Sequence, residues 1–491
     1  MGNTPLPRSV AAALLAAAAL ASAPPARAID QGKPARPGRT WYVDNTAAPD
    51  GDGSMVAPFD RLARAERAAD AGDTLYVFRG DGTSRGLDAG IRLRPFQRLI
   101  GSGARFEAEG ETPLPAGDRP LLAAAGGPVL VLADGVRVEG LAIAGGGDAI
   151  AGDGLADVHL AGVHVDGGLR LRDPRGLVHV ESTDLRAGGG PALAVESARG
   201  EARLELDGVT LLGGGATDDG LAVRAGGDAS LTVAAESTVL DGVAGNGVAL
   251  AAAGRSRLRL ELAGSGLVGD LPAGTSAALA AVVRDDATLE IAARGNDLPA
   301  RETAVLLAAN GRGHLRAELD DNVVGGAGSA RGVVLLLGDA GDAALTLTGN
   351  RIAGQRAEAL YAVAGAQTAL GIAARDNDLA AGAAAGSASY PALLVESNGT
   401  ARACVTLAEN RFAETGGGAP AVTLRQRDTG ILAVGGYTPA SAGDLTQRLA
   451  ATNRLSRAAV EADRPLGDPT STPCIDLPPP RPAMAVAAPP P

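Results

Sequence analysis

The stretch LTLTGNRIAG, residues Leu345–Gly354, alternates apolar and polar side chains and then breaks at a turn. Leu345 and Leu347 alternate with threonines, which is the two-residue period of a strand with one buried face. Gly349 and Asn350 end the strand, and both residue types tolerate a left-handed backbone. The stretch therefore predicts a short strand followed by a tight corner, with Asn350 in the left-handed conformation.

The same pattern recurs through the C-terminal half of the chain. It places asparagines at equivalent turns, 26, 28, 27 and 33 residues apart: Asn296, Asn322, Asn350, Asn377 and Asn410. A second apolar stretch lies between successive asparagines, such as AVLLA from Ala304 and VVLLL from Val333. Two short strands and two turns in about 28 residues form one coil of a solenoid. We predict that the asparagines stack as a turn ladder, with each side-chain amide bonded to its neighbours.

The composition suits a narrow solenoid. The chain has 491 residues, 70 glycines and only 2% aromatic residues. Small aliphatic side chains can fill a narrow bore, and glycine can form its corners. Counted from Ile91 at about 28 residues each, roughly 11–13 coils are expected. The net charge of −12 leaves no basic stripe for nucleic acid.

The N-terminus has the features of a secretory signal peptide. Arg8 precedes the apolar run 10–21, and a small-x-small cleavage site ends at Ala28. We therefore expect a protein that is secreted, or that lies at the cell surface or in the periplasm of a bacterium. No later segment reaches the roughly 20 apolar residues of a membrane-spanning helix, so none is expected in the mature chain.

The domain prediction follows from where the repeat begins and fades. It assigns a signal peptide to 1–28, a linker to 29–39, a β-helix with an N-terminal cap to 40–432, a closing segment to 433–477 and a disordered Pro-rich tail to 478–491. Cys404 and Cys474 are the only cysteines. An even pair in an oxidising compartment predicts a disulfide; the alternative is two free buried thiols.

The segment from Thr40 resembles a known family. An extended start, a glycine loop, an amphipathic helix over 59–71 and further strands carry this resemblance, through Tyr42-Val43-Asp44, Gly53, Pro58-Phe59, Leu62, Ala65, Gly72-Asp73-Thr74, Val77, Ile91, Leu93 and Gln97–Gly103. The pattern resembles the first segment of right-handed parallel β-helix proteins of the pectin lyase-like superfamily, which includes polysaccharide lyases and bacterial surface proteins. The resemblance implies an all-β, right-handed parallel β-helix in which the helix plugs the first coil. Residues 404–474 resemble, more weakly, the closing region of large exported β-helix proteins.

The catalytic motifs of that family are not assembled in this sequence. Its hydrolases use an Asn-Thr-Asp, an Asp-Asp, a Gly-His-Gly and a basic triplet on neighbouring coils. In this sequence only isolated fragments of these motifs occur: Thr183-Asp184, Asp218-Asp219 and Gly313-His314. A calcium site within 145–157 is an alternative, with Asp148, Asp153 and Asp157 as its acids. We predict no cofactor.

One group of residues remains as a candidate site. Alignment of VHLAGVHV, VHVESTDL and LELDGVTL stacks two outward columns, the first of His159, His179 and Glu205, the second of His164, Asp184 and Thr210. Such a patch could do acid–base chemistry or hold a metal. The alternative, which we favour, is a solvated ladder of polar residues on an exposed face.

Two functions follow. The first is an exported, non-catalytic surface or adhesin-like scaffold or binding protein, whose partner is a polysaccharide or a cell-surface molecule. The second is a polysaccharide lyase or glycoside hydrolase that acts on an acidic polysaccharide. The unassembled catalytic sets favour the first.

Overall fold

The computed structural model describes residues 38–108, 113–215, 218–268, 277–300, 302–382, 390–413, 419–437, 444–455, 457–462, 466–467, 469 and 474–477. The predicted signal peptide 1–28, most of the linker 29–39 and the tail 478–491 lie outside these residues. No helix in the described part of the chain is long and apolar enough to cross a membrane.

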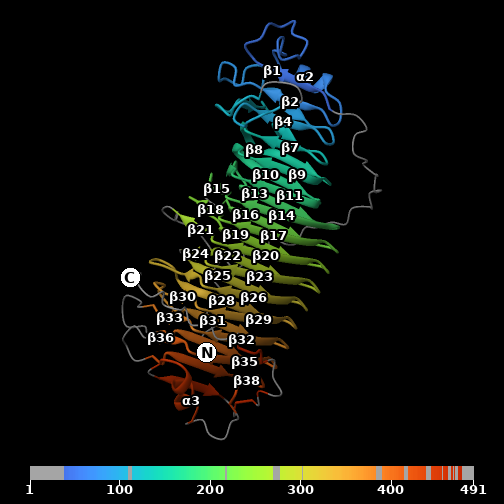
Figure 1. Cartoon of the computed structure of the whole chain (residues 1–491). Coiled ribbons are helices and arrows are strands. Elements are labelled where there is room, and N and C mark those ends of the chain that lie inside the picture. Colours follow the sequence, from blue (N-terminus) through green and yellow to red (C-terminus); the bar gives the residue numbers. More distant parts are fainter. Residues whose placement is uncertain are drawn as a thin grey trace, which may run out of the picture.

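The chain folds as a parallel β-helix whose coils contribute strands to three parallel sheets (Figure 1). The first sheet contains fifteen strands: β1 Thr40–Val43, β2 Thr74–Val77, β4 Arg98–Gly101, β7 Arg137–Glu139, β9 Ala156–Ala161, β11 Arg175–Glu181, β14 Glu201–Asp207, β17 Ser230–Glu236, β20 Arg257–Ala263, β23 Thr288–Arg294, β26 His314–Asp320, β29 Asp342–Thr348, β32 Ala369–Arg375, β35 Arg402–Ala408 and β38 Ile431–Val434.

The second sheet is built from mostly short strands that follow a tight turn: β5 Leu121–Ala123, β8 Ala142–Asp153, β10 His164–Arg172, β12 Asp184–Arg186, β15 Thr210–Leu212, β18 Val239–Asp241, β21 Gly266–Val268, β24 Asp297–Leu298, β27 Val323–Val324, β30 Arg351–Ile352, β33 Asp378–Ala380 and β36 Arg411–Ala413. The long strands β8 and β10 continue into the third sheet and connect the two.

The third sheet completes each coil before the chain returns to the first. Besides the ends of β8 and β10, its strands are β3 Ile91–Arg92, β6 Leu130–Val131, β13 Leu193–Ser197, β16 Leu221–Ala225, β19 Val248–Ala252, β22 Ala277–Val283, β25 Thr303–Ala309, β28 Arg331–Leu337, β31 Leu360–Ala364, β34 Leu393–Ser397, β37 Val422–Gln426 and β39 Ala458–Ala462. The first sheet has fifteen strands in the described part of the chain, which is more than the predicted 11–13 coils. The number is larger because β1 and β2, which precede the count from Ile91, already belong to this sheet.

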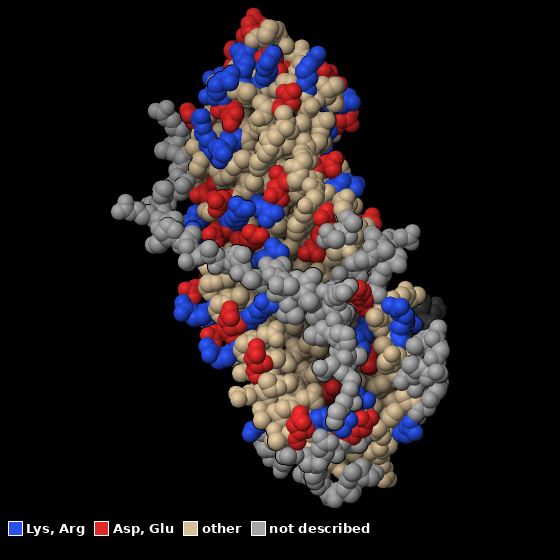
Figure 2. Space-filling view, turned by 180° about the vertical axis from the view of Figure 1, so that it is seen from behind, with Lys and Arg blue, Asp and Glu red and all other residues tan. Residues whose placement is uncertain are grey.

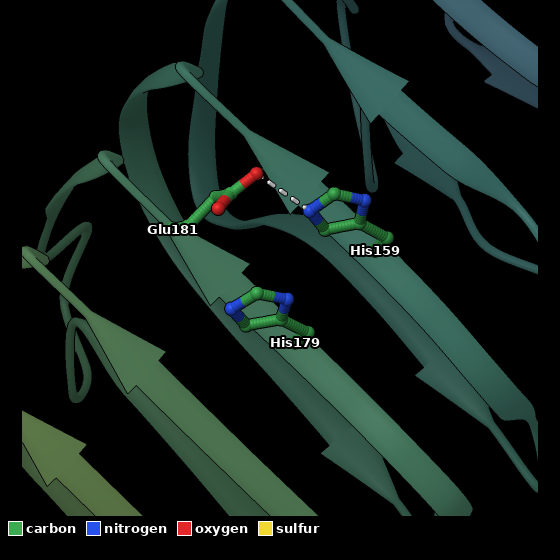
Figure 3. A group of neighbouring side chains, drawn as sticks. All are labelled: His159, His179 and Glu181. Carbon is green, nitrogen blue, oxygen red and sulfur yellow. Dashed lines mark hydrogen bonds and ion pairs between the residues drawn. The ribbon is translucent and has the colours of Figure 1, made fainter.

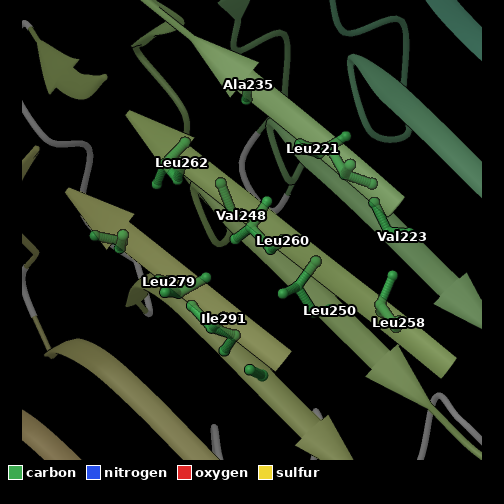
Figure 4. Close-up of a cluster of buried hydrophobic side chains, with 14 of the residues drawn as sticks. Leu221, Val223, Ala235, Val248, Leu250, Leu258, Leu260, Leu262, Leu279 and Ile291 are labelled. Carbon is green, nitrogen blue, oxygen red and sulfur yellow. The ribbon is translucent and has the colours of Figure 1, made fainter. Parts of the chain in front are cut away.

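Alternation along each strand separates the bore from the surface. In β20, Leu258, Leu260 and Leu262 are buried among the apolar residues of neighbouring coils (Figure 4). The intervening Arg259 and Glu261 point outward and form an ion pair at 2.8 Å. A shift of one residue would bury these charges, so the register is strongly fixed. On the face in Figure 2, acidic and basic side chains are interspersed along the molecule.

The corner between the first and second sheets holds the stacked asparagines. Nδ2 of Asn350 donates to Oδ1 of Asn377 at 2.9 Å and to the carbonyl oxygen of Leu319 at 2.7 Å. The same amide contact joins Asn296, Asn322, Asn350, Asn377 and Asn410, and continues to Asn453. The left-handed residue is the preceding Gly349, with φ +65°, so the prediction of a left-handed Asn350 is wrong.

The N-terminal end is closed by α2, Leu62–Ala68, which is shorter than the predicted helix 59–71. Leu62 and Ala65 are fully buried and belong to the main core. A separate aromatic cluster lies on the outer side of the first sheet and consists of Tyr42, Tyr76, Ile100 and Phe106. Several of the chain's few aromatic residues thus serve the cap rather than the bore.

The C-terminal end is covered by α3, Asp444–Thr452, whose Leu445 and Leu449 are buried. Beyond the predicted boundary at residue 432, β38 completes the first sheet, Asn453 extends the ladder and β39 extends the third sheet. The coil pattern therefore continues into the predicted closing segment, where α3 interrupts it.

The Cys404–Cys474 disulfide is present, with Cα atoms 4.9 Å apart. Cys404 lies on the outer face of β35, where its register neighbours are Gly371 and Ala433. Nearby, Oγ1 of Thr406 donates to the carbonyl oxygen of Ile475 at 3.3 Å. The disulfide thus fixes residues 474–477, the last part of the predicted closing segment, along the side of the first sheet and not over the end of the bore.

Candidate functional site

The strand register reproduces both predicted columns. His159 of β9 pairs with His179 of β11, and His179 pairs with Glu205 of β14. His164 likewise pairs with Asp184, and Asp184 with Thr210. The second column lies on the second sheet, however, beyond the corner of the coil. The columns therefore form two separate sites on different faces of the coil.

In the first column, the two histidines make a compact cluster with Glu181 (Figure 3). Their rings stack with centroids 4.9 Å apart and planes within 5° of parallel. Nε2 of His159 lies 2.9 Å from Oε1 of Glu181. A carboxylate can only accept, so this imidazole nitrogen donates the hydrogen bond. Burial lowers the pKa of His159, and the hydrogen bond to Glu181 opposes that effect.

Glu181 was missed in the sequence, although it has a recognisable signal. It follows His179 by two residues in VHVESTDL and so points to the same side of β11. Glu205, which we predicted to lie in this column, forms an ion pair with Arg203 instead, and Nε of Arg203 lies 2.7 Å from Oε1 of Glu205. The carboxylate nearest His159 thus comes from the neighbouring strand.

The second column is more loosely joined. Nδ1 of His164 lies 3.5 Å from Oδ2 of Asp184, and both side chains are about half exposed (46% and 49%). Thr210 follows Asp184 in register on β15. The fourth histidine, His314, pairs with Asp342 on the first sheet. These are isolated histidine–carboxylate pairs.

The outer face of the first sheet carries a hollow of about 1140 Å³. It extends from His179 on β11 to Thr346 and Thr348 on β29, and Asp476 of the C-terminal segment also lines it. Six strand steps separate β11 from β29, so the hollow is about 29 Å long at 4.8 Å per step. The histidine cluster stands at one end of this hollow.

The hollow arises from an alternation between successive coils. One outward column consists, in register, of Glu205, Ala234, Glu261, Ala292 and Glu318. Every second coil thus contributes only a methyl group to this column. At those coils the outer surface of the first sheet lies lower than at the coils that contribute a glutamate. This alternation is not evident along the sequence, because it appears only when the outward positions of several coils are aligned.

The charge of the hollow is mainly negative. Seven carboxylates line it against three guanidinium groups. Ion pairs hold several of them, including Arg203–Glu205 and Arg259–Glu261. Arg294 also pairs with Asp320 at 3.0 Å.

The acids considered for calcium do not come together. Within the described ranges, the residues that could jointly hold a metal are His159, His179 and Glu181. Asp148 accepts instead from Nε of Arg170 at 2.6 Å. Asp153 and Asp157 do not join it in a ligand group among the described residues.

Comparison with known proteins found similarity among solved structures only. No family model and no curated protein sequence matches it. Among solved structures it resembles two of GH136 lacto-N-biosidase from Eubacterium ramulus, one of a selenomethionine derivative and one of the native protein. For the selenomethionine derivative, identity is 11% and the TM-score 0.25, over 87% of this chain and 68% of the other. For the native protein, identity is 9% and the TM-score 0.27, over 86% and 68%. At these scores the likeness carries no argument about function.

Proposed function

We propose that the chain is an exported, non-catalytic binding scaffold whose hollow on the first sheet holds an extended neutral or amino-bearing polysaccharide. The observation that supports this proposal is the hollow, a depression about 29 Å long on the outer face of a parallel β-sheet. Its length suits a chain-like ligand that lies along the solenoid axis. Its carboxylates can accept hydrogen bonds from sugar hydroxyl or amino groups.

The charge of the hollow selects among polysaccharides. The excess of carboxylates over guanidinium groups repels a polyanion. A neutral chain does not meet this repulsion, and a chain with protonated amino groups is attracted. The ligand class therefore differs from the acidic polysaccharide that the sequence suggested for an enzyme.

A glycoside hydrolase remains the alternative, and one geometric feature favours it. Glu261 and Glu318 occupy one column two coils apart, a backbone spacing of about 9.6 Å. Inverting glycosidases separate their two carboxyl groups by roughly 6.5–9.5 Å. However, Glu261 is paired with Arg259 at 2.8 Å, and hydrolysis by this pair would require that contact to break. Binding without cleavage needs no such rearrangement.

The test is a panel of neutral, amino-bearing and acidic polysaccharides, each assayed for binding by calorimetry and for release of reducing ends or unsaturated products, with and without calcium. We expect binding of a neutral or amino-bearing polymer and no product. Ala292→Phe fills the floor of the hollow and should weaken binding at least tenfold.

Thr288→Phe is the matched control, because Thr288 lies on the same strand, β23, but does not line the hollow. Equal loss of binding in both variants, or binding that Ala292→Phe leaves intact, would contradict the proposed site. Product release that is abolished by Glu261→Gln or Glu318→Gln would establish the hydrolase instead.

A further inference from the structure

Three potential ligand atoms converge beside the hollow, at the cluster of His159, His179 and Glu181. One ligand atom from each side chain lies within 4.8 Å of the other two, and all three residues are half-buried. In the part of the chain that the structure describes, no other three histidine, cysteine or acidic side chains approach one another so closely. Among the four histidines of the chain, His159 and His179 are thus the two that lie within 4.8 Å of the same carboxylate.

We propose that His159, His179 and Glu181 bind a divalent cation of the zinc class. Two imidazole nitrogens and one carboxylate oxygen are a ligand set that Zn²⁺ accepts, whereas Ca²⁺ and Mg²⁺ prefer oxygen ligands alone. Three protein ligands leave a fourth tetrahedral position for water or another group. Because His179 also lines the hollow, that position lies beside the proposed ligand-binding surface.

The backbone already places the ligands on one side of the sheet. His159 and His179 are register partners on adjacent parallel strands, which are spaced by about 4.8 Å. Glu181 is two residues after His179 and therefore points to the same side. In Figure 3 each ring turns one nitrogen toward the side on which Glu181 lies. All three ligands thus come from strands, and their spacing does not depend on a loop.

Only small side-chain movements are needed to close the site. Ligand atoms bound to Zn²⁺ at about 2.1 Å in tetrahedral geometry lie about 3.4 Å apart. The separation of His159 Nε2 from Glu181 Oε1, 2.9 Å, is already shorter than that. The largest separation, up to 4.8 Å, must therefore shrink by about 1.4 Å, which rotation of exposed parts of the side chains can supply.

A metal bound by Nε2 of His159 must replace the hydrogen bond between this nitrogen and Glu181. Nε2–H of His159 donates to Glu181, so this nitrogen carries a proton in the metal-free cluster. For Nε2 to bind a metal, the imidazole must take its other neutral tautomer, in which the proton sits on Nδ1 and the Nε2 lone pair is free for the nitrogen–metal bond. The charged neighbours are already paired: Arg137 contacts Glu139, and Arg203 contacts Glu205.

The test is equilibrium dialysis of the full mature chain against zinc chloride at neutral pH, with no polysaccharide present. The wild type should bind one equivalent. His159→Ala, His179→Ala and Glu181→Gln should each weaken that binding at least tenfold. The matched control is the double variant His164→Ala, His314→Ala, which removes the two histidines of the isolated pairs and should bind as the wild type does.

A measurement on the unmutated chain guards against variants that fail to fold. In NMR spectra, saturating Zn²⁺ should shift the imidazole resonances of two of the four histidines. The control double variant lacks His164 and His314, so the resonances that remain in its spectrum are those of His159 and His179. No saturable binding, binding retained after His159→Ala with His179→Ala, or shifts at His164 and His314 would each overturn the site. The stacked rings would then be a polar ladder only. Since no sugar is present, this outcome is independent of the proposed polysaccharide binding.

Discussion

At the scale of single residues, Asp219 is the clearest case of a group whose environment opposes its charge. It is half-buried next to Asp218, and burial raises its pKa. Its Oδ1 accepts from the backbone nitrogen of Asn246 at 2.7 Å and from Nδ2 at 3.1 Å. Asn at position 219 could still accept through Oδ1 but would carry no charge.

The direction of the pH dependence follows from linkage. Because the folded-state pKa of Asp219 is raised, the folded state holds its proton more tightly than the unfolded state, and stability falls as pH rises from the ordinary carboxyl pKa near 3.9 through the raised value. Asp219→Asn should therefore resist urea better than the wild type at pH 7. The advantage should shrink as pH falls toward 4.

Denaturant unfolding of both proteins between pH 4 and 7 measures this difference. Asp228→Asn is the control, because Asp228 is exposed and pairs with Arg255, and it should bring no gain. A variant that is less stable than wild type at pH 7, or an advantage that does not change with pH, would show that the buried charge carries no cost.

At the scale of elements, the corner ladder is what joins one coil to the next. Asn350 is 1% exposed, and its Oδ1 accepts from the backbone nitrogen and Nδ2 of Asn322. Asn350→Val would leave these donors and the carbonyl oxygen of Leu319 without the bonds to the amide, while Oδ1 of Asn377 would keep only the backbone nitrogen of residue 350. A buried group left unsatisfied costs about 1–3 kcal/mol, so we expect a loss of about 3 kcal/mol in unfolding free energy.

A second variant separates hydrogen bonding from backbone strain. Gly295, the residue before Asn296, has φ +64° and open space where a Cβ would lie. Gly295→Ala should therefore cost only the left-handed penalty of about 1 kcal/mol. Equal losses for the two variants in denaturant unfolding, or an unchanged Asn350→Val, would mean that the ladder contributes little.

These elements also mark how far the sequence predicts the structure. Periodicity gave the coils, and the offsets of 20 and 26 residues between His159, His179 and Glu205 match the strand register. Side-chain direction within the column could not be predicted, because rotamers decide that Glu181 meets His159 while Glu205 meets Arg203. The hollow likewise depends on outward residues of several coils together.

The C-terminal boundary was missed for a different reason. The helix α3 is inserted between β38 and the corner at Asn453, so the period in the sequence is lost before the bridge of Arg454 to Arg411 and then β39 restore the pairing. In this segment Asn453 is the one residue that matches the repeat, at the position of the turn asparagine, and a single residue does not establish a coil. Interruption by an inserted element thus hides a coil that the backbone still completes.

At the scale of the whole molecule, the two ends of the solenoid limit its stability, since a terminal coil has a neighbour on one side only. Helices that bury one apolar face cover both ends, with α2 at the first coil and α3 at the last. The Cys404–Cys474 bond has a separate role. It closes a loop of 70 residues in sequence separation and holds segment 474–477 against the outer face of the first sheet.

Closing a loop of this length stabilises the folded state by about 4 kcal/mol in the chain-entropy model. Because the crosslink joins β35 to the segment that follows α3, reduction should loosen the last coils and leave the central ones protected. Hydrogen exchange of the oxidised and reduced protein should differ at β35, β38, α3 and β39, but not at β20 or β23. In the reduced protein the disulfide would no longer hold Asp476 at the hollow. Hydrogen exchange at β29 therefore reports whether segment 474–477 also stabilises that part of the first sheet. Faster exchange spread evenly along the solenoid, or none at all, would show that the bond does not act as a local clamp.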